Sequence, residues 1–181
     1  MTCIVGIEHA GAVTIGGDAA AVEGLRLTVR TDPKVFFVDD FLIGFEDSFR
    51  MGQLLRYRLR VPSQKCDDDF EFMATTFVDA VRKCFTAGGF SRNDDGEESG
   101  GSFLVGYGGR LYAIDSDYHV GRARCGFEAI GCGSEFAIGS MASTTGPAEN
   151  RVRMALTVAA THCAGVVAPF TILTSTETFY E

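Results

Sequence analysis

The stretch MTCIVGIEHAGAVTIGGDAA, residues 1–20, predicts a β-hairpin at the very start of the chain. Apolar residues alternate over 3–7 and run together over 12–15, and the intervening His9-Ala10-Gly11 segment is a turn signal. Chain ends normally fray, so a core strand that starts at the second residue needs a reason. Either it forms a well-ordered sheet edge, or the terminus itself has a role in function.

Beyond this hairpin, strand patterns and helix patterns follow one another in groups. Helical apolar spacing is found in four segments: 47–59, 69–85, 134–143 and 152–163. Strands are expected over 25–29, 34–38, 41–45, 103–107, 111–114, 127–130 and 170–173. The glycine-rich, acidic segment 87–101 has little to bury and is predicted to be a long exposed loop. This order predicts an α+β fold, with helices outside and two sheets inside.

Composition limits the class of protein. The 181 residues are 46% apolar, which suits a single domain spanning 1–181 with a sizeable core. A formal net charge of −8 argues against nucleic acid or an anionic membrane as the main partner. No apolar run approaches eighteen residues and no signal-peptide pattern opens the sequence, so we expect a cytoplasmic protein.

Cofactor and metal motifs are absent from the sequence. The six cysteines contain no CxxC pair and the three histidines lie in separate regions, so we expect mostly buried thiols and no metal site. There is no GxxxxGK[ST] motif, so any energy-dependent unfolding of a substrate would need a separate ATPase. We expect no cofactor.

Three residues of the N-terminal region fit one kind of chemistry. A threonine hydroxyl is a poor nucleophile and needs an adjacent base, which an N-terminal threonine carries as its own α-amine. A nearby lysine would lower the pKa of both groups, and an aspartate would hold that lysine in place. Thr2, Asp18 and Lys34 are these residue types, and strand pairing can bring them together.

The setting of these residues resembles a known superfamily. Thr2 opens TCIVGI, Asp18 closes TIGGD sixteen residues later, and Lys34 opens KVFFVDD after another sixteen. This spacing is similar to that of the proteasome-type threonine peptidases of the N-terminal nucleophile hydrolase superfamily, such as proteasome β subunits and HslV. The segment EAIGCGSEFAIGSM, residues 128–141, resembles the glycine-serine-glycine turn and following helix of these proteins.

The resemblance implies a four-layer αββα sandwich and a mature chain from which Met1 has been removed. It also implies polypeptide substrates, cleaved inside a self-compartmentalised homo-oligomeric ring. Gly44 falls where the oxyanion-hole glycine is expected, although a packing glycine at a strand end is the alternative. Cys132 replaces the helper serine, Gly133 completes the turn, and Ser134 is the nearest hydroxyl.

The same alignment suggests the pocket for the substrate side chain that precedes the scissile bond. It includes Ala21, Asp32, Leu42 and Glu46. Two carboxylates would favour a cationic side chain. Alternatively, Asp32 caps the turn before Pro33 and Glu46 begins a helix, with both side chains in solvent.

The sequence therefore predicts a threonine-type endopeptidase. Two other functions stay open: a non-catalytic ring or scaffold subunit with the same fold, and an N-terminal nucleophile amidohydrolase that acts on small amides. A scaffold has no need to keep Thr2, Asp18 and Lys34, and the oligomeric state would separate the amidohydrolase.

Overall fold

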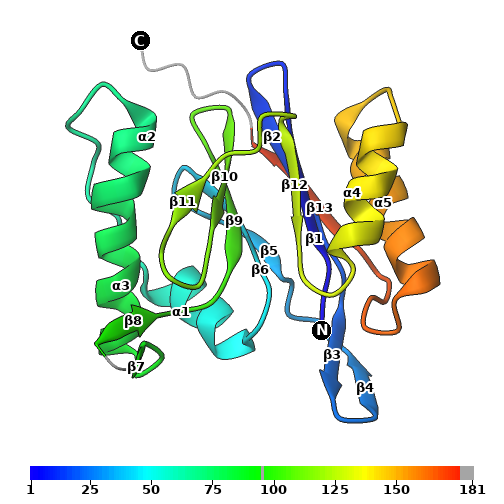
Figure 1. Cartoon of the computed structure of the whole chain (residues 1–181), viewed down its shortest axis with the longest axis horizontal. Coiled ribbons are helices and arrows are strands. Elements are labelled where there is room, and N and C mark those ends of the chain that lie inside the picture. Colours follow the sequence, from blue (N-terminus) through cyan, green and yellow to red (C-terminus); the bar gives the residue numbers. More distant parts are fainter. Residues whose placement is uncertain (95, 176–181) are drawn as a thin grey trace.

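The computed structural model describes residues 1–94 and 96–175, and two antiparallel sheets lie face to face at its centre (Figure 1). In spatial order, the first sheet contains β12 (Phe127–Ile130), β1 (Ile4–His9), β2 (Ala12–Gly17) and β13 (Thr171–Ser175). The second contains β11 (Val120–Gly121), β10 (Arg110–Ile114), β9 (Phe103–Tyr107), β6 (Phe41–Phe45) and β5 (Val35–Val38).

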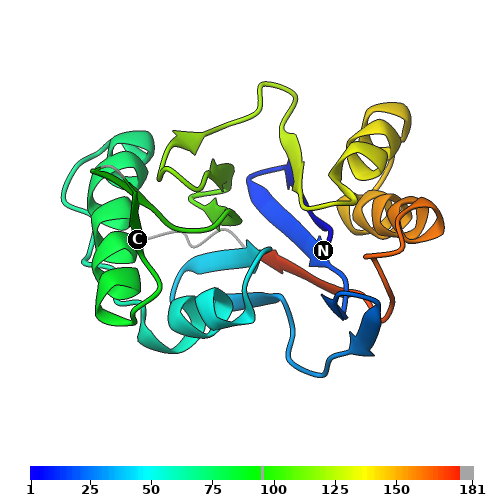
Figure 2. The same cartoon turned by 60° about the horizontal axis from the view of Figure 1, so that its bottom comes forward.

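Helices cover the outer face of each sheet, as Figures 1 and 2 show from two sides. The first sheet is covered by α4 (Ser134–Ser143) and α5 (Ala148–His162). The second is covered by α1 (Phe49–Arg58) and by a continuous helical segment made of α2 (Asp69–Phe72), the π-helical turn Met73–Phe77 and α3 (Val78–Ala87). The predicted four-layer αββα sandwich is confirmed.

The N-terminal hairpin forms as the sequence predicts. β1 and β2 pair from His9–Ala12 to Ile4–Gly17, and the two turn residues, Ala10 and Gly11, have φ angles of 49° and 76°. Positive φ at both positions matches the right-handed twist of the strands. The hairpin lies in the middle of its sheet, so that both its edges are paired, β1 with β12 and β2 with β13.

The interior between the two sheets is purely aliphatic. Its buried side chains are Ile4, Val13, Ile15, Val35, Leu42, Leu104 and Leu111. One further apolar layer lies between each sheet and the helices that cover it. The sheets are therefore locked together by close packing, which fixes the position of the chain segments at their ends.

Two regions differ from the predictions. Residues 20–30 form a separate hairpin of β3 (Ala20–Glu23) and β4 (Arg26–Val29), which extends away from the sandwich (Figure 1). The expected loop 87–101 contains a small hairpin, β7 (Arg92–Asp94) and β8 (Glu97–Ser99). Polar contacts hold this hairpin in place: Glu98 accepts hydrogen bonds from Arg82, Thr86 and Ser91. The sequence prediction missed the hairpin because the pattern of apolar residues does not reveal polar contacts of this kind.

None of the helices in the described part of the chain has the length and apolar character that crossing a bilayer requires.

Candidate active site

Backbone pairing brings the three predicted catalytic residues to one end of the sandwich. The β1–β2 register places Ile4 opposite Gly17, and Asp18 N–H donates to the Cys3 carbonyl at 3.3 Å, so Thr2 and Asp18 become neighbours. Lys34 directly precedes β5 in the facing sheet, and its carbonyl accepts a hydrogen bond from Phe45 N–H at 3.0 Å. The site is therefore shared between the two sheets.

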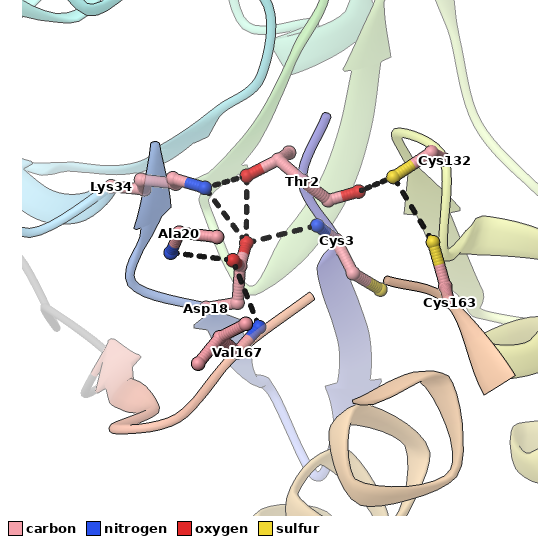
Figure 3. Close-up of polar contacts among 8 residues, drawn as sticks. All are labelled: Thr2, Cys3, Asp18, Ala20, Lys34, Cys132, Cys163 and Val167. Carbon is pink, nitrogen blue, oxygen red and sulfur yellow. Dashed lines mark hydrogen bonds and ion pairs between the residues drawn. The ribbon is translucent and has the colours of Figure 1, made fainter. Parts of the chain in front are cut away.

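The three side chains make direct contact (Figure 3). Thr2 Oγ1 donates to Asp18 Oδ1 at 2.6 Å, and Lys34 Nζ donates both to Asp18 Oδ1 at 2.8 Å and to Thr2 Oγ1. Thr2, Asp18 and Lys34 are only 2%, 3% and 3% exposed. The hydroxyl of Thr2 is thus held between an ammonium and a carboxylate, away from bulk water.

The Asp18 carboxylate is fixed by the backbone around it. Its Oδ1 accepts Cys3 N–H at 3.0 Å, and its Oδ2 accepts Ala20 N–H at 2.8 Å and Val167 N–H at 3.4 Å. Burial lowers the pKa of the Lys34 ammonium, while the Asp18 carboxylate opposes that shift. The Asp18 carboxylate therefore helps to keep the buried Lys34 side chain protonated.

A glycine-rich turn holds the backbone of Thr2. The Thr2 carbonyl accepts Gly133 N–H at 3.2 Å and the Cys132 thiol at 3.4 Å. Gly131 has φ of 93°, and a Cβ there would lie 2.3 Å from the Thr2 carbonyl oxygen, so this position requires glycine. Ser134 instead begins α4 and donates its N–H to the Gly131 carbonyl at 3.0 Å.

A cavity of about 410 Å³ opens beside Thr2 and Lys34. Ala21 and Glu46, two of the predicted pocket residues, contribute to its walls, together with Arg26 of the β3–β4 hairpin. In the chain that keeps Met1, burial raises the pKa of Glu46 to about 7, the negative charge of Asp47 adds to this shift, and the amine of Met1 opposes it. The cavity therefore contains a carboxyl group that changes charge near neutral pH.

Several solved structures share the architecture of this chain. The chain matches Thiobacillus denitrificans BPH in complex with epoxomicin with a TM-score of 0.80 and 14% identity, covering 98% of this chain and 100% of that one. It matches eukaryotic HslV from Trypanosoma brucei with a TM-score of 0.67 and 20% identity, covering 96% and 98%. An Anbu (Gly-1) mutant from Hyphomicrobium sp. strain MC1 gives a TM-score of 0.67 at 14% identity, covering 95% and 80%.

This chain has the proteasome-type fold. The resemblance inferred from the Thr2, Asp18 and Lys34 segments thus agrees with the structural matches over nearly the whole chain. No protein-family model matches the sequence, and comparison with curated proteins finds no relative. At these low identities the likeness concerns the proteasome-type fold, and the roles of individual residues have to be argued from their geometry.

Two predicted pocket residues lie outside the cavity. Leu42 is 0% exposed and packs between the sheets, so it cannot line a substrate pocket. Asp32 lies on a neighbouring surface, where its side chain is 41% exposed and accepts hydrogen bonds from Arg30 at 2.9 and 3.0 Å. Of the two predicted pocket carboxylates, Glu46 therefore lines this cavity, while Asp32 lies outside it and pairs with Arg30.

Gly44 is also placed differently from the oxyanion-hole prediction. It lies inside β6, which is paired with β5 on one side and β9 on the other. A Cβ at this position would lie 2.6 Å from Ile4 and 2.8 Å from Ile15. The structure therefore favours the packing alternative, in which glycine allows the two sheets to approach.

Other contacts of the site gave no signal in the sequence. The Val167 N–H that reaches Asp18 comes from the segment between α5 and β13, and any residue type except proline supplies such a donor. The Sγ atom of Cys163, the residue after α5, lies 3.2 Å from the Sγ atom of Cys132.

Within residues 1–94 and 96–175, no three His, Cys, Asp or Glu side chains lie together as metal ligands.

Proposed function

We propose that this chain is a threonine-type endopeptidase in which Thr2 becomes the N-terminal residue once Met1 is removed. The observation that supports this most directly is the buried contact of Thr2 Oγ1 with both Lys34 Nζ and Asp18 Oδ1. Burying a lysine is unfavourable unless the ammonium is paired. A threonine with a purely structural role would not require such a lysine beside its hydroxyl, so the contact supports a chemical role for Thr2.

In the proposed reaction, the free α-amine of Thr2 accepts the hydroxyl proton, directly or through water. Lys34 stabilises the developing negative charge on Oγ1 through its hydrogen bond, and Asp18 keeps Lys34 in position. Oγ1 then attacks the peptide carbonyl carbon. The tetrahedral intermediate collapses to an ester on Thr2 and expels the new amine, which takes the proton held by the α-amine.

Water completes the cycle by attacking the ester. The α-amine accepts a proton from this water, the carboxylic acid product leaves, and the Thr2 hydroxyl is restored. We expect the oxyanion donor to come from backbone that faces the cavity, since Gly44 lies within the sheet. Asp47 lines the cavity just before α1, and Phe49, which also lines it, is the first residue of that helix. The first-turn N–H groups of a helix have no acceptor within it, and of those in α1 the Arg50 N–H is already bonded to Ser48 Oγ.

The proposed substrates are polypeptides, cleaved inside a homo-oligomer, with any unfolding supplied by a separate ATPase. Among the predicted pocket residues, Glu46 is the carboxyl group that reaches the cavity, so we expect its charge to favour a cationic side chain before the scissile bond.

The decisive experiment combines intact mass with labelling by a β-lactone or an epoxyketone. We expect loss of Met1, one adduct per chain mapped to Thr2, and hydrolysis of fluorogenic peptides. Thr2→Ala should lose the adduct and about 10⁴-fold or more of the activity, while Thr2→Ser, which keeps a hydroxyl, should retain both in part. A chain that retains Met1 and takes no label would favour the scaffold function instead.

A substrate panel separates the remaining alternative. Turnover of peptides of several residues supports an endopeptidase. Labelled protein that hydrolyses only small amides would favour the amidohydrolase.

A further inference from the structure

Two thiols lie in contact beside the backbone of Thr2. Cys132 Sγ and Cys163 Sγ are 3.2 Å apart and point toward one another (Figure 3). They come from separate segments: Cys132 lies in the turn before α4, and Cys163 directly follows α5. Cys132 is exposed and Cys163 is half-buried, so small molecules can reach this thiol pair.

The environment of the pair keeps the two segments close. Gly165 passes beside Cys132, since a Cβ built on it would lie 2.8 Å from Cys132 Sγ. Cys163 itself is anchored, because its N–H donates to the Ala159 carbonyl at 2.8 Å. A side chain at position 165 would meet Cys132 Sγ, whereas glycine leaves room for this sulfur.

We propose that Cys132 and Cys163 form a reversible disulfide that controls the Thr2 site. The effect on activity rests on the proposed function, whereas formation of the bond does not. A covalent S–S bond is about 2.04 Å long, so the two sulfurs would approach by roughly 1.2 Å. In a reducing compartment such pairs are usually redox-responsive rather than structural.

The oxidant is a small disulfide, such as oxidised glutathione. One cysteine, as thiolate, attacks a sulfur of the small disulfide; a mixed disulfide forms and one small thiolate leaves. The second cysteine, as thiolate, attacks the protein sulfur of that mixed disulfide and expels the second small thiolate. The two protons released by the cysteines are taken up by the two small thiolates, and the two cysteines have lost two electrons in total.

The disulfide acts on Thr2 through two hydrogen bonds. Cys132 donates its S–H to the Thr2 carbonyl, and a disulfide sulfur has no hydrogen to donate. The adjacent Gly133 N–H holds the same carbonyl at 3.2 Å, so movement of the turn toward Cys163 displaces this donor as well. Thr2 loses one backbone anchor and has the other shifted, and a nucleophile displaced by about 1 Å loses much of its rate.

The first test measures the bond itself. Purified full-length protein is incubated with oxidised or reduced glutathione, digested under acidic conditions and analysed by peptide mass spectrometry. We expect a linked pair of peptides containing Cys132 and Cys163, which dithiothreitol separates. Cys163→Ser should abolish the link, and the matched control Cys125→Ser, at an exposed cysteine elsewhere, should leave it unchanged. Stable glutathione adducts on both cysteines, or equal linkage of other cysteine pairs, would overturn the proposal.

The second test measures the effect on Thr2. Hydrolysis by the linked protein should fall by about tenfold or more and recover with dithiothreitol, whereas Cys163→Ser should keep its basal rate and ignore the oxidant. Equal hydrolysis by the linked and reduced forms would overturn control of Thr2. If the reduced protein hydrolyses nothing and yet forms the link, the proposed peptidase function fails while the disulfide site stands.

Discussion

Lys34 is the residue whose surroundings most constrain the chemistry at Thr2. Its ammonium is buried, and it contacts both the Thr2 hydroxyl and the Asp18 carboxylate. Removing the charge leaves Asp18 with the Thr2 hydroxyl and backbone N–H groups as donors but with no buried cation. The same residue therefore serves stability and reactivity, and substitutions must be measured for both.

We predict that Lys34→Met lowers peptide hydrolysis by at least about 10²-fold and the free energy of unfolding by about 3 kcal/mol. The physical reason is loss of the cation that stabilises Oγ1 and pairs with Asp18. Urea denaturation and kcat measurements on folded protein check the two parts separately. Lys83→Met, at an exposed lysine of α3, is the matched control and should change neither. Near-normal kcat in folded Lys34→Met would contradict the assigned role.

Glu46 predicts a pH-dependent substrate preference. Its pKa is raised to about 7, so it is mainly neutral below that pH and mainly negative above it. The ionised fraction rises from about one tenth at pH 6 to about nine tenths at pH 8. The ratio of kcat/KM for a peptide with arginine before the scissile bond to that for one with glutamine should therefore rise several-fold over this range.

Using the ratio removes any pH dependence that Thr2 and Lys34 impose on both peptides. Glu46→Gln should make the ratio independent of pH. Glu23→Gln, at an exposed carboxyl of the same cavity wall, should leave the rise intact. A flat ratio in the unmodified protein would mean that the Glu46 carboxyl does not meet the substrate side chain.

At the scale of single elements, β6 shows why a glycine is hard to interpret from sequence. A glycine near a strand end fits both close approach of a substrate and close packing of two sheets, and the local pattern FLIGF is the same in either case. The choice depends on the facing strands β1 and β2, whose Ile4 and Ile15 lie against Gly44. Such contacts are set by tertiary packing, which apolar periodicity does not encode.

We predict that Gly44→Ala lowers the free energy of unfolding by about 1–3 kcal/mol. The added Cβ meets the γ2 methyl groups of Ile4 and Ile15, which are attached directly to Cβ and cannot move aside without a change of rotamer. Urea denaturation checks this. Gly139→Ala, where a Cβ on α4 meets nothing within 4 Å, should instead stabilise by about 0.5–1 kcal/mol. Unchanged stability in Gly44→Ala would contradict the packing role.

At the scale of the whole molecule, the sequence predicted the candidate site best where reactive residue types lie at the ends of predicted strands. The alternation around the Ala10-Gly11 turn sets the register that brings Thr2 beside Asp18, and the strand beginning after Lys34 supplies the third residue. The groups of strands and helices also predict the αββα layers. The Val167 donor and the Cys132–Cys163 contact depend on where segments distant in sequence meet, so local patterns could not predict them.

The β3–β4 hairpin gives a prediction about assembly. On β4 and its flanks, Arg26, Thr28 and Arg30 face the cavity, while the alternate residues Leu25, Leu27 and Val29 are 107%, 46% and 49% exposed. A two-stranded hairpin is marginally stable alone, and this one extends away from the sandwich (Figure 1). We therefore expect a second copy of the chain to cover its apolar face, consistent with the proposed homo-oligomer.

Light scattering at micromolar concentration should accordingly give the mass of a homo-oligomer. Leu27→Asp combined with Val29→Asp places two charges on the apolar face and should shift the protein toward the monomer, because a buried unpaired carboxylate is strongly unfavourable. Phe70→Asp, at a 44% exposed residue of α2 on the opposite side of the sandwich, is the control and should leave the mass unchanged. A monomeric unmodified protein would contradict the assembly. An oligomer that persists in the double variant would show instead that a different surface, such as the outer face of α4 and α5, joins the copies.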